Sequence, residues 1–219
     1  MTSLLICTLI FMFVTSASGE FGYGDLVADL LFSFIVVAGV LTTFRRRWLG
    51  GLAVALAAAS LVLTWHQEIH PVASLTILNT ALRLSFLGFL FAVLIVQVFG
   101  AGAVTAQRIR GAIVVYLLLG GIWSMLYHMV AVAIPGSFRF PEALATADPR
   151  AIGRILVYFS FSTLTTTGFG DITPVHPLAR SLAMFEALAG QLYLVITMAR
   201  LVSQAIVGER DKVQNNSKD

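Results

Sequence analysis

Charged residues are scarce in this chain of 219 residues: Asp, Glu, Lys and Arg together make up only 11% of it. Hydrophobic residues make up 58%, and the mean hydropathy is +0.89. A soluble domain of this size could not bury so much apolar surface, so we expect a lipid bilayer to be its solvent. The net charge of +3 does not indicate nucleic-acid binding, because the basic residues lie in short segments between apolar runs.

Cysteine and histidine are also few. The single cysteine, Cys7, excludes a disulfide within the chain and gives no sign of a metal cluster. His66 and His70 lie near each other in sequence, but two histidines without a third ligand are a weak metal signal. His128 lies deep in an apolar run without an evident polar partner, which favours a packing role over a proton relay. The sequence therefore predicts no cofactor and no enzyme active site.

Several apolar runs approach or exceed the length of a membrane-spanning helix, about 20 residues. The first is barely long enough, so it predicts either a short helix or a signal peptide, and no Lys or Arg precedes it as in a signal peptide. The sequence thus predicts an all-α integral membrane protein with six transmembrane helices, or with five and a signal peptide. The runs cover residues 1–17, 26–44, 48–65, 74–99, 112–134 and 177–204.

Arginine is unevenly distributed among the segments between these runs. Residues 45–47 and 108–110 carry five Arg, whereas residues 18–25 and 66–73 carry none. Because basic residues favour the cytoplasmic side, we expect the Arg-rich segments and the C-terminal tail to be cytoplasmic. The predicted location is the cell's inner (plasma) membrane, which the chain crosses several times.

A threonine- and glycine-rich segment interrupts the apolar pattern near the end of the chain. It is TLTTTGFGD, residues 163–171, and it follows a helical run, residues 149–163, that is too short to span a bilayer. Non-helical backbone at membrane depth is tolerated only where protein or a water-filled passage surrounds it. We therefore expect a re-entrant helix, starting at Asp148 and Pro149, that enters the membrane and returns through this segment.

Two glycines in this segment predict an unusual backbone. Gly168 and Gly170 can adopt the positive φ angles that other residues avoid. Alternation of such residues with ordinary ones can turn successive carbonyl groups to the same side of an extended chain. A ladder of carbonyl oxygens can replace the water shell of a cation. The string FGYGD at residues 21–25 lacks the threonines and the preceding helices, so it predicts only a turn.

The segment TTGFGD, residues 166–171, resembles the selectivity filter of potassium channels. The resemblance implies a potassium-binding segment that ends at Gly170, and a homotetramer, because one segment supplies a quarter of each ring. Thr167 stands where Val or Ile is usual, and Phe169 where Tyr is usual. The hydroxyl of Thr167 leaves open a second interpretation, a cation channel of weak selectivity. The implied K⁺ ligands are the Thr166 hydroxyl and the carbonyls of Thr166, Thr167, Gly168 and Phe169.

The resemblance covers about residues 112–205, which look like the pore of bacterial channels grouped with two-pore-domain potassium channels. The first hundred residues resemble only the general four-helix preamble of six-span channels. A third interpretation, a membrane enzyme or structural subunit with an incidental turn, would need polar groups converging at one depth, and the sequence shows no such set. The predicted parts are a four-helix membrane region, a cytoplasmic linker, a pore domain and a cytoplasmic tail, at residues 1–100, 101–111, 112–205 and 206–219.

Other residues receive roles from the same resemblance. Gly190 lies nineteen positions after Asp171, where the family often has a gating hinge. Glu186 is the one acid well inside a span, and we expect it to hydrogen-bond to Ser160, Ser162 or Thr163. The predicted filter-support residues are Asp171, Ser162, Thr163 and Glu186. The residues predicted to line the inner cavity, on one helical stripe, are Gln191, Leu194, Met198 and Val202.

The fourth apolar run contains a single basic residue, Arg83. A voltage sensor needs several Arg or Lys residues repeated at about every third position of such a helix. Arg83 is predicted either to extend toward the membrane surface or to pair with Asp29 of the second run. The sequence therefore predicts little or no voltage sensing.

Overall fold

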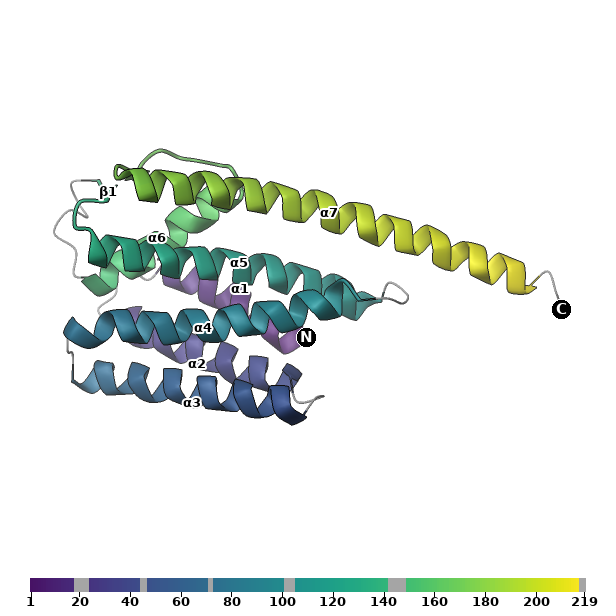
Figure 1. Ribbon diagram of the computed structural model, residues 1–219, viewed down its shortest axis with the longest axis horizontal. Helices are drawn as coiled ribbons and strands as arrows, with labels where there is room; N and C mark the ends of the chain where they lie inside the picture. The colour runs from purple at the N-terminus through teal and green to yellow at the C-terminus, as the bar shows by residue number, and fades with distance from the viewer. Residues whose placement is uncertain (18–23, 44–46, 71–72, 101–104, 142–148, 217–219) are drawn as a thin grey trace.

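The apolar runs of the sequence form long helices that lie side by side (Figure 1). The computed structural model describes residues 1–17, 24–43, 47–70, 73–100, 105–141 and 149–216. Among these residues the only strands are β1, Phe138–Arg139, and β2, Thr173–Pro174, so the predicted all-α class is confirmed. The helices are α1 Thr2–Ala17, α2 Gly24–Thr43, α3 Arg47–Ile69, α4 Ala73–Val98, α5 Ala106–Ala133, α6 Pro149–Leu164 and α7 Pro177–Asn216.

Some sequence predictions fall on residues outside the described ranges. These predictions concern part of the FGYGD string, part of the first Arg-rich segment, the first four residues of the predicted linker, the helix start at Asp148 and the end of the tail. The residues concerned are 21–23, 45–46, 101–104, 148 and 217–219.

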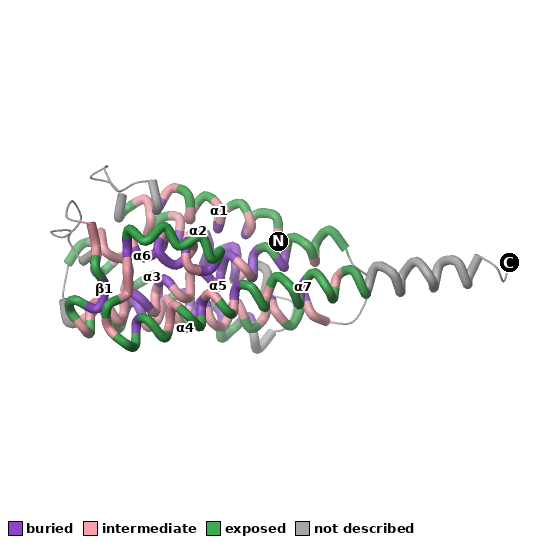
Figure 2. The backbone as a smooth tube through the Cα atoms, turned by 90° about the horizontal axis from the view of Figure 1, so that it is seen from above, coloured by how far each residue is buried: buried purple, intermediate pink, exposed green. Residues whose placement is uncertain are grey.

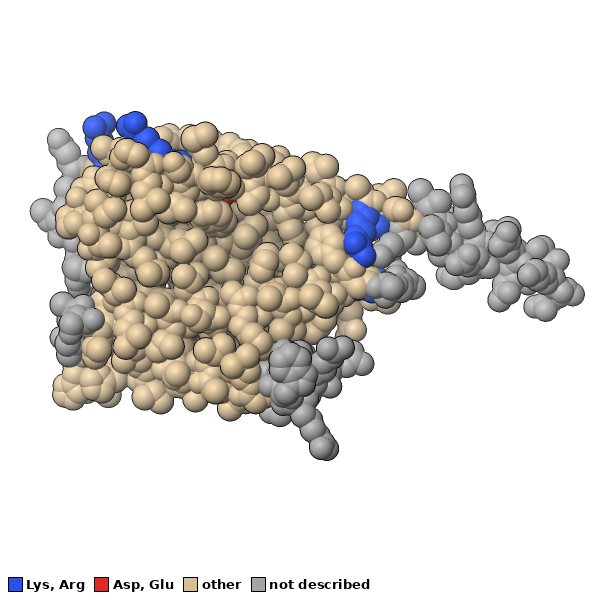
Figure 3. All heavy atoms as spheres, viewed as in Figure 1, with Lys and Arg blue, Asp and Glu red and all other residues tan. Residues whose placement is uncertain are grey.

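Four helices are long and apolar enough to cross a bilayer within the described residues, namely through Gly50–Gln67, Leu75–Val98, Ala106–Ala133 and Pro177–Ser203. The described apolar parts of α1 and α2 are shorter. On the face shown in Figure 3, Lys and Arg atoms gather at the two ends, and the broad band between them is almost free of charge. This pattern fits a bilayer around the middle of the bundle, and the chain is a multi-pass membrane protein.

The first seventeen residues form α1, which packs into the helix bundle. α1 lies against α2, α5 and α6. Leu4 is completely buried, and it belongs to the same apolar cluster as Phe32 of α2, Leu90 of α4 and Val114 of α5. Figure 2 shows this buried interior between the helices. The segment is therefore helical and packed, and both interpretations, a short first membrane helix and a signal peptide, stay predictions.

Two helices of the predicted pore half are longer than the sequence predicted. α5 begins at Ala106, before the apolar run that starts at residue 112, because Thr105 caps its first turn by accepting a hydrogen bond from the Arg108 N–H. α7 continues to Asn216, through much of the predicted tail. α4 packs along α5, and this contact joins the N-terminal helices to the predicted pore half.

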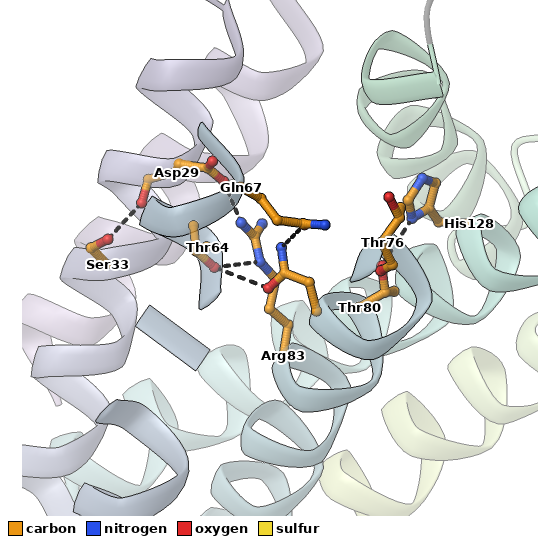
Figure 4. Close-up of polar contacts among 9 residues, drawn as sticks. Asp29, Ser33, Thr64, Gln67, Thr76, Thr80, Arg83 and His128 are labelled. Carbon is orange, nitrogen blue, oxygen red and sulfur yellow. Dashed lines mark hydrogen bonds and ion pairs between the residues drawn. The ribbon is translucent and has the colours of Figure 1, made fainter. Parts of the chain in front are cut away.

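Arg83 of α4 forms an ion pair with Asp29 of α2, with 2.6 Å between nitrogen and oxygen (Figure 4). This confirms one of the two alternatives predicted for Arg83. Its Nε also donates to Thr64 Oγ1 of α3 at 3.0 Å. Thr64 in turn donates to the Asn79 side-chain oxygen, and Asn79 donates to Gln67 at 2.8 Å. A polar cluster therefore ties α2, α3 and α4 together.

His128 of α5 has a polar partner that the sequence did not reveal. Thr80 Oγ1 of α4 lies 3.3 Å from the Nδ1 atom of His128 (Figure 4). The same hydroxyl lies 2.9 Å from the Thr76 carbonyl, to which it donates. The partner was missed because it lies in a different helix. The contact agrees with a packing role for His128 and adds a polar link between α4 and α5.

Candidate functional site

The Thr- and Gly-rich segment begins where α6 ends, at Leu164. In Figure 1 the chain then runs back along α7 to the first turn of that helix. We call residues 165–171 the return loop. The carboxyl end of α6 therefore leads directly into the loop, as the sequence predicted for a re-entrant helix. A helix carboxyl end carries a partial negative charge, which favours a nearby cation.

The backbone of the return loop alternates in handedness. Thr166, Gly168 and Gly170 have positive φ angles of 58°, 57° and 81°. Thr167 and Phe169 between them are not in this region. Both glycines thus adopt the conformation that the sequence predicted for them. The positive φ of Thr166 was not predicted, and it is uncommon for a β-branched residue.

The N–H groups of the return loop face α6. Thr167 N and Gly168 N lie 2.9 Å and 3.2 Å from the Ser162 carbonyl oxygen, and Phe169 N lies 3.4 Å from Ser162 Oγ. Ser162, a predicted support residue, therefore holds three successive N–H groups. In the described part of the chain, no hydrogen bond ends on the carbonyl oxygens of residues 166–169. The loop thus presents carbonyls without partners on the side away from α6.

The hydroxyl of Thr167 has a defined partner. Thr167 Oγ1 lies 2.8 Å from Thr165 Oγ1, which lies 2.7 Å from the Phe161 carbonyl and donates to it. Because a hydroxyl has one hydrogen, Thr165 accepts from Thr167. A hydrogen bond therefore stands where a filter usually has an apolar contact. The Thr163 side chain, another predicted support group, donates to the Phe159 carbonyl within α6, and the Thr163 carbonyl accepts a hydrogen bond from the Thr166 N–H of the loop at 2.9 Å.

Two contacts hold the far end of the return loop. The Asp171 carboxylate accepts a hydrogen bond from the Tyr158 hydroxyl of α6. The Tyr158 ring stacks on the Phe169 ring, with centroids 5.9 Å apart and planes 11° apart. Asp171 was a predicted support residue, whereas the role of Tyr158 was missed. No local signal marks it, because the contact joins a helix to a loop thirteen residues later.

Two short strands pair next to the return loop: β1, which follows α5, and β2, which follows the loop. β1 pairs antiparallel with β2, with Phe138 opposite Pro174. The Ser137 carbonyl accepts hydrogen bonds from Val175 N at 2.8 Å and His176 N at 3.1 Å. The segment after α5 therefore fixes the chain between the return loop and α7. No sequence pattern indicated this pairing, because both strands are only two residues long.

A family model described as "Ion channel" matches residues 153–206. These residues are most of α6, the return loop and the apolar part of α7. The match supports an ion channel. It also points to a channel rather than an enzyme. The comparisons with curated proteins and with solved structures gave no match.

Glu186 of α7 is completely buried. Its Oε2 lies 2.5 Å from the Tyr127 hydroxyl of α5, and its Oε1 lies 2.5 Å from Ser160 Oγ of α6. Ser160 Oγ also lies 2.8 Å from the Gly120 carbonyl of α5. Of the three predicted partners of Glu186, Ser160 makes the contact. Tyr127 was missed because it lies in a helix far away in sequence.

Gly190 of α7 lies directly against the end of α6. A Cβ atom added at Gly190 would lie 2.3 Å from the Leu164 carbonyl oxygen and 2.9 Å from Leu164 Cδ1. The same carbonyl is 3.3 Å from the Tyr116 hydroxyl of α5. The structure therefore gives Gly190 a packing role: it allows α7 to approach the start of the return loop.

The four residues predicted to line a cavity all lie on the exposed part of α7. Gln191 Nε2 is 3.3 Å from Thr166 Oγ1, so this side chain reaches the return loop. Leu194, Met198 and Val202 are 42%, 62% and 52% exposed in the single chain. Within the described residues, these three side chains are only partly covered. This open stripe continues from the return loop along α7.

Within the described residues, no group of three or more His, Cys, Asp or Glu side chains lies close enough to hold a metal ion. His66 and His70 have ring centroids 5.7 Å apart and face each other at a tilt.

Proposed function

We propose that the chain is one subunit of a homotetrameric potassium channel in which residues 166–170 form the selectivity filter. The observation that carries the proposal is the return loop itself. Its N–H groups bond to Ser162, its φ angles alternate in sign, and the carbonyls of residues 166–169 accept no hydrogen bond in the described chain. Four such loops around one axis would stack rings of four oxygens, which can replace the water shell of K⁺.

The exposed face of α7 supports assembly from several copies. Several large apolar side chains along this helix are more than half exposed in the part of the chain that the structure describes. A closed ring of identical subunits would bury part of this face and bring four return loops together, because each chain supplies only one loop. The most exposed of these side chains are Met184, Phe185, Leu188, Val195, Ile196 and Met198.

The proposed orientation follows the arginine distribution. The return loop would enter from the outer side of a bacterial plasma membrane, and the C-terminus would lie in the cytoplasm. Little voltage sensing is expected, because Arg83 is the only basic residue of α4 and is paired with Asp29. Moving one paired charge cannot give steep voltage dependence.

A cation channel of weak selectivity is the second candidate. The observation that favours it is the hydroxyl of Thr167, which bonds to Thr165 in place of an apolar contact behind the filter. The two candidates differ in the ratio of K⁺ to Na⁺ permeability. Reversal potentials measured in K⁺/Na⁺ gradients separate them.

The test is a flux assay on the purified protein in liposomes. We expect K⁺ flux well above Na⁺ flux for the wild type, and loss of K⁺ flux in Gly168→Ala and Gly170→Ala, because Ala is strained at positive φ. Gly88→Ala is the matched control, because nothing lies within 4 Å of the added Cβ. K⁺ flux retained in both filter variants would contradict the proposal. So would a wild type that assembles without fourfold stoichiometry.

A further inference from the structure

The last helix makes two adjacent contacts with the start of the filter. Gly190 lies against the Leu164 carbonyl, and this close approach sets the position of α7 relative to the end of α6. The next residue, Gln191, then places its amide nitrogen 3.3 Å from Thr166 Oγ1. The amide is therefore held next to the innermost residue of the proposed filter.

The hydrogen bonds of the Thr166 hydroxyl can be counted. It carries one hydrogen and two lone pairs. The Thr165 carbonyl, 2.6 Å away, takes the hydrogen. The Gln191 amide donates to one lone pair. One lone pair remains for a cation, and the hydroxyl can no longer turn its hydrogen toward the ion.

Thr166 also needs support because of its backbone. Its φ of 58° lies in the left-handed region, which a β-branched residue rarely adopts. Its N–H is held by the Thr163 carbonyl at 2.9 Å. The side chain has the Gln191 amide as its contact from α7. Without that amide, rotation of the hydroxyl would be less restricted.

We propose that Gln191 is a specificity-determining residue of this channel, whose amide holds the Thr166 hydroxyl as an acceptor toward the permeating cation. The inference rests on the proposed function, because it gives Thr166 the innermost coordination site. The ring of amides from four copies would then set how strongly that site binds K⁺ and how well it excludes Na⁺. The number and field strength of coordinating dipoles are the properties that such a ring controls.

The test replaces the amide and measures binding as well as flux. Gln191→Met keeps the length of the side chain and removes the donor. Leu192→Met is the matched control, because Leu192 is the next residue of α7 and its half-exposed side chain is apolar. The first readout is the K⁺ concentration that half-protects the tetramer against thermal unfolding. The second is the permeability ratio of Na⁺ to K⁺ from reversal potentials.

We expect Gln191→Met to raise both the half-protecting K⁺ concentration and the Na⁺/K⁺ permeability ratio by about 2- to 10-fold, the equivalent of one hydrogen bond. Leu192→Met should match the wild type. In a Thr166→Val background, which lacks the hydroxyl, Gln191→Met should have no further effect on K⁺ protection.

Two results would overturn the inference alone: Gln191→Met identical to the wild type in both readouts, or the same shift with and without the Thr166 hydroxyl. A wild type that passes no K⁺ and gains no protection from K⁺ would overturn the proposed function, and the inference with it.

Discussion

The carboxylate of Glu186 and the hydroxyl of Tyr127 meet at 2.5 Å in the buried space between α5, α6 and α7. The other carboxylate oxygen meets Ser160, whose hydroxyl also reaches the Gly120 carbonyl. One hydroxyl hydrogen cannot serve both acceptors. A proton on Glu186 would complete the set, with Glu186 donating to Ser160 and Ser160 donating to Gly120.

Substitutions at Glu186 test this arrangement. We expect Glu186→Gln to keep K⁺ flux and thermal stability near wild-type values at all pH values, because its amide can donate to Ser160 while its oxygen accepts from Tyr127. Glu186→Ala should lower the free energy of unfolding by about 1–3 kcal/mol for each polar group left without a partner. Thermal unfolding and flux across pH are the measurements. A functional loss in Glu186→Gln equal to that in Glu186→Ala would show that the negative charge is required.

Gly190→Ala should disrupt the contact between α7 and α6. The added methyl carbon would lie 2.3 Å from the Leu164 carbonyl oxygen, which is backbone and cannot rotate away. We expect a loss of about 1–3 kcal/mol in stability, typical of overpacking, and reduced K⁺ flux. Gly88→Ala, with open space around the added carbon, should leave both unchanged. A Gly190→Ala channel of full stability with altered opening only would instead favour the hinge role implied by the resemblance.

Thr167→Val tests whether the hydroxyl behind the filter weakens selectivity. Val restores the apolar side chain usual at this position, and Thr165 keeps the Phe161 carbonyl as its acceptor. We expect the K⁺/Na⁺ permeability ratio to stay within about twofold of the wild-type ratio, less than the effect of one hydrogen bond. The ratio is measured from reversal potentials. A large rise in selectivity would show that the natural chain is the weakly selective channel of the second candidate.

The ion pair between Arg83 and Asp29 should behave as a structural pair. Arg83→Gln leaves a partly buried carboxylate without its partner, and we expect a loss of about 3–5 kcal/mol, or less where water reaches the site. The double variant Arg83→Gln with Asp29→Asn should recover much of this loss. Thermal unfolding of Arg83→Gln, of Asp29→Asn and of the double variant measures the coupling.

The conductance–voltage relation of the double variant provides a second check on this pair. It should be as shallow as that of the wild type, because no charge of α4 then remains to move. A steep wild-type curve that flattens in the double variant would contradict the proposal of little voltage sensing.

Local sequence patterns predicted much of this architecture. The long apolar runs predicted the long helices, and a run too short to span a bilayer predicted α6. Gly168 and Gly170 predicted positive φ angles at those two positions. The pairing of Arg83 with Asp29 was one of two alternatives predicted for Arg83. The helices and the glycine conformations depend on composition and spacing along one segment.

The contacts that the sequence did not predict join distant segments. Tyr127 of α5 bonds to Glu186 of α7, and Tyr158 of α6 bonds to Asp171 of the return loop. The pairing of β1 with β2 involves too few residues to produce a recognisable sequence pattern. The left-handed backbone of Thr166 was missed for a related reason. A β-branched residue disfavours a positive φ angle, so no sequence pattern indicates one at Thr166. Hydrogen bonds from the surrounding structure hold Thr166 in this conformation.

The position of α1 limits which helices of this protein can be transferred to another membrane protein. α1 is far from α5 and α6 in sequence, but it packs against both of them. Its Leu4 side chain is completely buried. A graft of α5 to α7 onto other membrane helices would leave that contact surface bare. We therefore expect that a chimera containing α5 to α7 must also contain α1, or another helix of matching shape in its place.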